Sequence, residues 1–112
     1  MPTIRKGAEP VTFINVITVE PDRQPALIAL LGDAAQQTFR HLPGFVSASI
    51  HQSMDGRTVV MYAQWSSLDD FHAMQRNPEA QAHIAKVSAL GRFSGSVCEV
   101  AETVEAALEA GA

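Results

Sequence analysis

The sequence contains a single cysteine, Cys98, among its 112 residues. One thiol cannot form an intrachain disulfide, and no Cys-x-x-Cys pair or Cys/His spacing typical of a metal site occurs. Apolar runs are short as well, because none approaches the roughly 20 residues that cross a bilayer. The opening MPTIRKGAEP lacks the apolar core of a signal peptide. We therefore expect a cytoplasmic protein with no metal and no membrane partner.

Positive charge is also scarce. Eight Lys and Arg stand against twelve Asp and Glu, and the basic residues do not gather on any stretch. Nucleic acids and anionic membranes attract clustered basic residues, so neither is an expected partner. With 46% apolar and 18% charged residues, the composition is that of one globular domain with a single core.

Along the rest of the chain, strand patterns and helix patterns follow one another. Segments that alternate or are dense in β-branched residues predict four strands, at 11–19, 45–53, 58–65 and 96–105. Apolar residues at helical spacing predict a helix that begins near Asp22, as its cap, and runs to His41. A second helix is expected from Ser67 to Leu90, with a break and restart at Asn77-Pro78.

This order predicts a ferredoxin-like α+β sandwich, in which a four-stranded antiparallel sheet carries both helices on one face. The domain is expected over residues 11–105, between a loose arm over 1–10 and a tail over 106–112. The other sheet face has no element left to cover it, although it carries apolar residues. A second copy is the simplest cover, so we expect a homodimer joined through Ile14, Val16, Val60 and Tyr62.

Asn15 and Trp65 stand out because the first and third strands are neighbours in this fold. Asn15 lies between Phe13 and Ile17 on one strand face. A buried carboxamide there either bonds backbone or water, or it lines a ligand cavity. Trp65, the only Trp, ends the third strand and is either a core anchor or a cavity wall.

Short motifs in a fixed order carry a family resemblance. These are Phe13-Ile14-Asn15, Pro43-Gly44-Phe45, Asp55-Gly56, Tyr62-Ala63-Gln64-Trp65, and Ser67 to Phe71 followed by Asn77-Pro78. Residues 11–104 thereby resemble the antibiotic biosynthesis monooxygenase family, and most of all its small oxygenases that convert polyketide anthrones to quinones without metal or flavin. The resemblance implies a dimeric α+β barrel with a pocket between sheet and helices in each subunit.

The resemblance also implies which residues form the site. Asn15 and Trp65 match the Asn and Trp that the family uses. Where some relatives have a third-strand Asn and a helix Tyr, this sequence has Met61 and Phe71, so roles as amide donor or phenolic acid do not carry over. The residues expected around a small aromatic substrate are Phe13, Ile17, His51, Met61, Ala63, Phe71, Met74 and Arg92.

Without a flavin, nicotinamide or haem motif, the electrons for dioxygen would come from the substrate, so we expect no cofactor. A deprotonated anthrone can reduce dioxygen, form a peroxide and eliminate water to give a quinone. Asn15 and the indole N–H of Trp65 could hold the oxygens, but neither is a base.

A proton acceptor is therefore sought among the histidines. His72, early in the second helix, is the candidate catalytic base, with His51 beside the substrate. A surface or structural role is the alternative for each, and His41 and His83 are expected to be solvated. Arg92 could steady a phenolate or lie exposed.

Other functions on the same fold stay open. A haem-degrading or quinol monooxygenase is one, although Met74 stands near where a haem-degrading relative has a helix Trp, and His83 is one position out of register. A polyketide cyclase and a non-catalytic dimeric module that binds a small ligand are the others.

Overall fold

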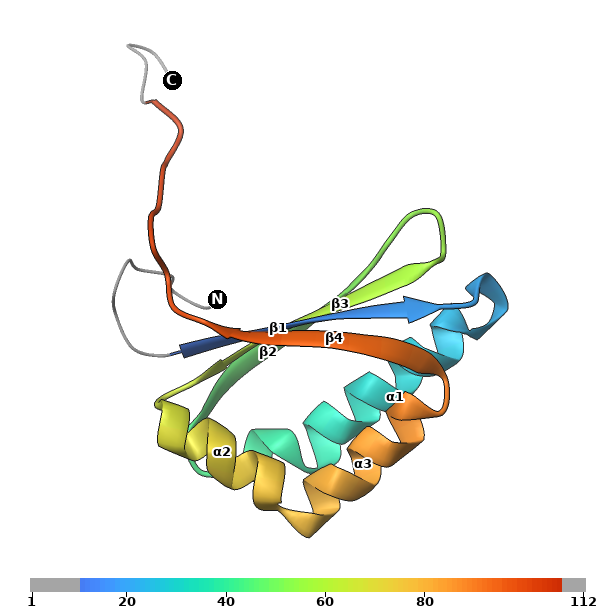
Figure 1. Ribbon diagram of the computed structural model, residues 1–112, viewed down its shortest axis with the longest axis horizontal. Helices are drawn as coiled ribbons and strands as arrows, with labels where there is room; N and C mark the ends of the chain where they lie inside the picture. The colour runs from blue at the N-terminus through green and yellow to red at the C-terminus, as the bar shows by residue number, and fades with distance from the viewer. Residues whose placement is uncertain (1–10, 108–112) are drawn as a thin grey trace.

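The computed structural model describes residues 11–107, which form a sheet layer and a helix layer (Figure 1). The arm expected over residues 1–10 and the last five residues of the expected tail lie outside the described residues. The strands are β1 Val11–Val19, β2 Phe45–Gln52, β3 Thr58–Trp65 and β4 Gly91–Cys98. The helices are α1 Gln24–Gln37, α2 Leu68–Arg76 and α3 Pro78–Ser88, with short 3-10 turns η1 Pro21–Arg23 and η2 Phe39–His41.

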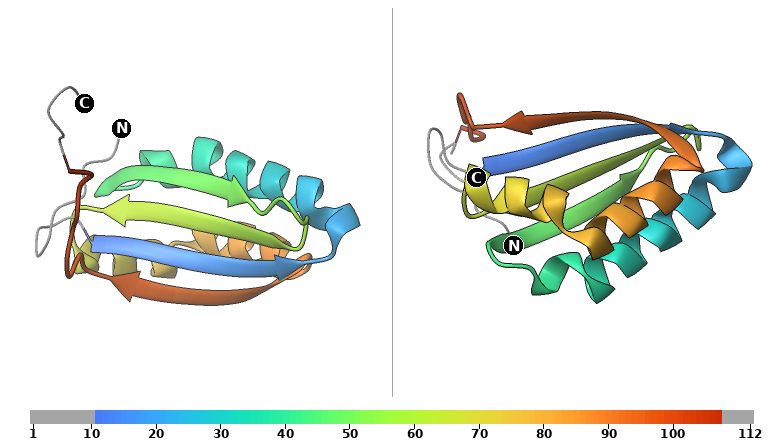
Figure 2. Two further views of the ribbon diagram at one scale, coloured as in Figure 1. Left: turned by 90° about the horizontal axis from the view of Figure 1, so that it is seen from above. Right: turned by 60° about the horizontal axis from the view of Figure 1, so that its bottom comes forward.

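The sheet is antiparallel with strand order β2-β3-β1-β4. All three helices cover one of its faces, and the left view of Figure 2 looks onto the face that no described helix covers. Central strands β1 and β3 pair so that Asn15 lies opposite Met61 and Val11 opposite Trp65. The ferredoxin-like α+β prediction is confirmed, and so is the adjacency of β1 and β3.

Side-chain alternation along the central strands sets the position of the core. Val59, Met61, Ala63 and Trp65 of β3 are all buried against the helices, whereas Val60 and Tyr62 between them are only half-buried. Leu27 and Leu31 of α1 and Phe71 of α2 close the core from the other side. Burial of such apolar side chains supplies about 25 cal/mol per Å² and is the main force that joins the two layers.

Polar caps fix where α2 and α3 begin. The Ser67 hydroxyl accepts a hydrogen bond from the Asp70 N–H at 3.1 Å, and Asn77 Oδ1 accepts one from the Ala80 N–H at 3.0 Å. These caps confirm the predicted start near Ser67 and the restart at Asn77-Pro78. Gly44 has a φ of +82°, and a Cβ there would overlap the Asp70 side chain, so this turn needs glycine.

The predicted β2–β3 hairpin is also present. Gly56 takes a φ of +80° in the turn. The Ser53 hydroxyl donates to Asp55 Oδ1 at 2.7 Å and the Arg57 N–H donates to the same oxygen at 3.0 Å. These two hydrogen bonds, the Ser53 bond first, lower the pKa of the Asp55 carboxyl from its ordinary value.

The prediction of the fourth strand was wrong. β4 occupies Gly91–Cys98 rather than 96–105, and residues 99–107 extend away from the sheet without regular structure (Figure 1). Gly91 and Gly95 have no side chain, so the alternation of apolar and polar residues that marks a strand is hard to recognise in β4. A Cβ on Gly91 would come within 2.7 Å of the Ile17 side chain, and a Cβ on Gly95 within 2.8 Å of the Phe13 ring. Side chains of the neighbouring strand β1 therefore fill the space beside these two glycines.

The first helix also departs from its prediction at both ends. Asp22 lies in η1, and the residue that caps α1, Arg23, makes no side-chain cap bond. The helix stops at Gln37 because Thr38, with φ −126° and ψ −65°, leaves the helical region. Residues up to His41 then form η2 rather than the last turn of α1.

Candidate functional site

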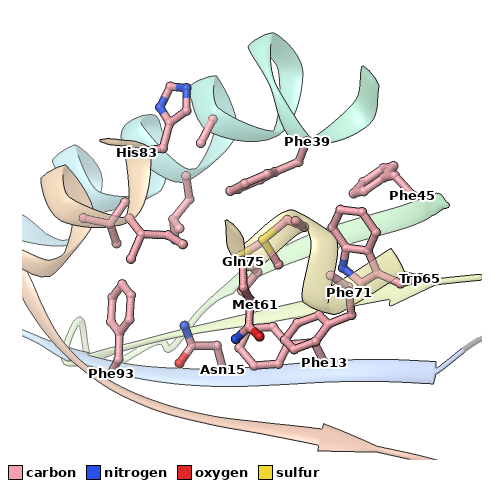
Figure 3. Close-up of a pocket in the computed structure, with 16 residues that line it drawn as sticks. Phe13, Asn15, Phe39, Phe45, Met61, Trp65, Phe71, Gln75, His83 and Phe93 are labelled. Atoms are coloured by element: carbon pink, nitrogen blue, oxygen red, sulfur yellow. The ribbon is translucent and has the colours of Figure 1, made fainter. Parts of the chain in front are cut away.

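A cavity of about 200 Å³ lies between the sheet and the helices (Figure 3). Every strand and every α-helix contributes to its lining, together with η2. The lining residues are Phe13, Asn15, Leu31, Ala34, Phe39, Phe45, Met61, Ala63, Trp65, Phe71, Met74, Gln75, His83, Ile84, Val87 and Phe93. All five phenylalanines of the sequence and its only tryptophan are among them.

The aromatic rings pack against one another in pairs. The ring centroids of Phe13 and Phe71 lie 5.0 Å apart at 41°, and those of Phe45 and Trp65 lie 5.3 Å apart, edge to face at 85°. Pairs at such distances hold their rings in fixed orientations. The cavity therefore has rigid aromatic walls of the kind that accommodate a flat, apolar ligand.

Two buried polar atoms in this wall have no hydrogen-bond partner among the described residues: Asn15 Oδ1 and Trp65 Nε1. Asn15 is 6% exposed and Trp65 is 2% exposed. An unpaired buried polar atom costs about 1–3 kcal/mol, so a native fold retains it where water or a ligand can satisfy it. Central strands β1 and β3 thus bring one acceptor and one donor to the same cavity.

Five of the other expected substrate neighbours also line the cavity: Phe13, Met61, Ala63, Phe71 and Met74. Ile17, two residues after Asn15 on β1, does not line the cavity, because it is completely buried in the core.

The structure also leaves His51, His72 and Arg92 away from the cavity, which corrects their expected positions. A register shift between Phe45 and Ser47 turns β2, so that Phe45 lines the cavity while His51 is exposed beside Ser49. Arg92, in β4 rather than after it, pairs with Thr18 and is exposed. His72 is exposed on α2, with its ring 5.9 Å from that of Phe71.

Nine lining residues were not predicted from the sequence: Leu31, Ala34, Phe39, Phe45, Gln75, His83, Ile84, Val87 and Phe93. The most consequential is His83, which was expected to be solvated. It is half-buried, and its Nε2 lies 2.9 Å from Thr38 Oγ1. These two residues are 45 positions apart, so a local pattern could not join them. The spacing of Glu79 and His83, one helical turn, was the available signal.

No group of three His, Cys, Asp or Glu side chains in residues 11–107 could hold a metal ion. Within the same range, no helix has the length and apolar character needed to cross a bilayer.

An α+β sandwich that encloses an aromatic-walled cavity with few polar groups defines a class of small-molecule-binding domains, many of them enzymes. Residues 10–86 match the model of the family described as antibiotic biosynthesis monooxygenase. The chain is 39% identical to tetracenomycin-F1 monooxygenase from Streptomyces glaucescens over 112 residues, which is 100% of both proteins. The chain therefore belongs to the antibiotic biosynthesis monooxygenase family, as its sequence resemblance predicted, and it is an oxygenase.

Solved structures agree with this assignment. SnoaB, a cofactor-independent oxygenase from Streptomyces nogalater, is 25% identical with a TM-score of 0.70, over 87% of this chain and 98% of SnoaB. The ActVA-Orf6 monooxygenase of Streptomyces coelicolor, solved with the ligand Nanaomycin D, is 26% identical with a TM-score of 0.78, over 88% of this chain and 93% of that one.

Proposed function

We propose that this protein oxidises an aromatic polyketide of the anthrone type to a quinone, with dioxygen as co-substrate and without a cofactor. The observation that carries the proposal is the cavity, in which aromatic walls surround the unpaired Asn15 Oδ1 and Trp65 Nε1. The relatives support it, since one is named for tetracenomycin F1, SnoaB is described as cofactor-independent, and ActVA-Orf6 was solved with Nanaomycin D.

The reaction needs little from the protein beyond binding, aimed hydrogen bonds and one proton transfer. The substrate methylene loses a proton, and the enolate passes one electron to dioxygen. The two radicals recombine at the same carbon, and the resulting peroxide loses water to leave a carbonyl. In sum, CH₂ and O₂ become C=O and H₂O, and the substrate supplies every electron.

Asn15 and Trp65 would act on the oxygens of this substrate. The indole N–H of Trp65 is placed to donate to a substrate or peroxide oxygen, while Asn15 offers both an acceptor and amide donors. In a cavity shielded from water such hydrogen bonds stabilise developing negative charge more strongly than in solution. The aromatic rings would hold the flat substrate in the orientation that these bonds require.

The proposal includes a homodimer in the cytoplasm, formed through the sheet face that no described helix covers. Val16 on this face is 40% exposed, and Ile14, Val60 and Tyr62 beside it are half-buried. A contiguous apolar patch of this kind on a central strand pair is typical of an interface.

The test is oxygen consumption with 1,8-dihydroxyanthrone as the probe, corrected for the rate without protein. Asn15→Ala and Trp65→Phe are each expected to lower kcat on the order of 10²-fold, the effect of removing one preorganised hydrogen bond. Circular dichroism checks that both variants fold, and exposed Gln52→Ala is the matched control.

The quinone product should carry one more oxygen and two fewer hydrogens than the substrate, whereas cyclisation would only lose water. A wild-type rate equal to the blank with every anthrone and hydroquinone tried would refute the proposal.

A further inference from the structure

His83 carries the one imidazole among the described residues that line the cavity, and imidazole is the side-chain group best suited to acid–base chemistry in proteins. The other polar members of the lining, Asn15, Trp65 and Gln75, cannot accept a proton near neutral pH. His83 lies in the helix layer, across the cavity from Asn15 on the sheet (Figure 3). A reaction in this cavity that begins with loss of a proton therefore has one side chain available to receive it.

A hydrogen-bonded chain fixes the imidazole of His83. Thr38 Oγ1 donates to Glu79 Oε2 at 3.1 Å and lies 2.9 Å from His83 Nε2. Thr38 has a single hydroxyl proton, and an ionised carboxylate can only accept. With that proton directed to Glu79, Nε2–H of His83 must be the donor to Thr38. In the neutral imidazole the lone pair then resides on Nδ1, which makes Nδ1 the basic nitrogen.

The fold holds this chain in place from two elements. Thr38 is 3% exposed and occupies the non-helical position that ends α1, which aims its side chain at α3. The ring of Phe39 meets the imidazole at 61°, with 6.3 Å between centroids. A proton-transfer histidine is commonly oriented through one ring nitrogen by a hydrogen-bonded third group, and here that group is Thr38, which in turn bonds a carboxylate.

We propose that His83 is the acid–base residue of the oxygenase reaction, and that Thr38 and Glu79 are its positioning residues; this rests on the function proposed above. The methylene C–H bond of the substrate breaks, its proton moves to Nδ1, and its electron pair stays on the substrate as the enolate. The imidazolium is stabilised by Glu79 through Thr38. After the peroxide forms, His83 returns the proton to its terminal oxygen, and the imidazole is neutral again. The second C–H bond at the same carbon then breaks, its electron pair forms the carbonyl bond, and the O–O bond cleaves. The released hydroxide combines with this second proton as water.

Other charged groups near His83 are few. On its own helix Glu79 lies one turn before it and Lys86 one turn after it, and Lys86 is exposed. On η2, Arg40 is exposed and donates to Gln36 Oε1 at 2.8 Å. The base must be neutral, so wild-type kcat/KM should fall as the pH decreases through the range in which imidazoles titrate.

The kinetic test compares His83→Gln with the exposed His72→Gln and His41→Gln as matched controls, using 1,8-dihydroxyanthrone. His83→Gln should lose on the order of 10²–10⁴-fold in kcat and lose the acid limb of the pH profile, the usual contribution of a general base. The two control variants should keep the wild-type kcat and the acid limb of the pH profile. Thr38→Val should lower kcat less and move the acid limb, and Thr38→Ser should restore the wild-type profile. A wild-type rate and acid limb in His83→Gln would overturn the proposal.

A binding experiment keeps this inference separate from the proposed function. A hydroxyanthraquinone changes colour when its phenol loses a proton, whether or not the protein turns over a substrate. At a pH where the free dye is neutral, wild type should bind it with the phenolate band, and His83→Gln should bind it without that band. If the two proteins give the same spectrum, His83 does not accept protons in the cavity. If the band difference is present while no anthrone is oxidised, the proposal of anthrone oxidation fails and the proton-accepting role stands.

Discussion

Asn15 and Gln24 are both buried side-chain amides, and the contrast between them shows what the cavity costs the fold. Gln24, 8% exposed, donates to the carbonyl oxygens of Thr58 at 3.0 Å and Ser53 at 3.2 Å, and so ties α1 to the β2–β3 hairpin. Asn15 is as deeply buried, but its Oδ1 has no partner in the described part of the chain. One amide therefore stabilises the fold, while the other is retained at a cost that a bound ligand would offset.

This contrast predicts opposite changes in stability for similar substitutions. Asn15→Leu, which keeps the side chain close in size, should leave the free energy of unfolding unchanged or raise it by about 1 kcal/mol, while oxygen consumption is lost. Gln24→Leu should lower the free energy of unfolding by about 1–3 kcal/mol, because two hydrogen bonds are lost, although each carbonyl oxygen keeps a backbone donor. Urea unfolding followed by circular dichroism measures both. A destabilised Asn15→Leu would mean that water or another group already satisfies Asn15.

At the scale of elements, local sequence patterns correctly predicted those strands, turns and helix starts that are specified by their own residues. The β-branched run of β1, the Asp55-Gly56 turn, and the caps Ser67 and Asn77 were all predicted and found. β4 was misplaced because its shape depends on Phe13 and Ile17 of another strand. His83 was missed for a similar reason, because its partner Thr38 is 45 positions away in the sequence.

β4 is expected to limit the width of the cavity, and Gly95→Ala tests this expectation. A Cβ there would lie 2.8 Å from the Phe13 ring and 3.5 Å from Asn15 Oδ1, so this ring, which lines the cavity, must move. We expect a loss of about 1–3 kcal/mol in stability, as for other overpacked cores, and a raised KM for 1,8-dihydroxyanthrone. Ser94→Ala, next to it on the exposed face of the same strand, should change neither. An unchanged KM in Gly95→Ala would show that the substrate does not approach β4.

At the scale of the whole molecule, the central strands β1 and β3 contribute side chains both to the cavity and to the opposite face of the sheet. Asn15 and Trp65 point to the cavity, whereas their neighbours Val16 and Gln64 point to the other face of the sheet. Any contact that holds the uncovered face therefore acts on the same backbone that positions the two polar groups. Assembly and activity are expected to be coupled through this sheet rather than through a separate hinge.

The uncovered face predicts how assembly can be broken. Val16→Lys places a charge in the centre of the proposed interface, where an unpaired buried charge is costly, and should convert a dimer into a monomer. Val46→Lys is the control, since Val46 is 46% exposed but lies at the edge of β2, beside Arg40 and Gln36 of the helix layer. Sedimentation equilibrium gives the mass of each protein, and oxygen consumption by monomeric Val16→Lys shows whether the site needs the second copy. A wild-type protein that sediments as a monomer, or a Val16→Lys variant that remains dimeric, would place the interface elsewhere.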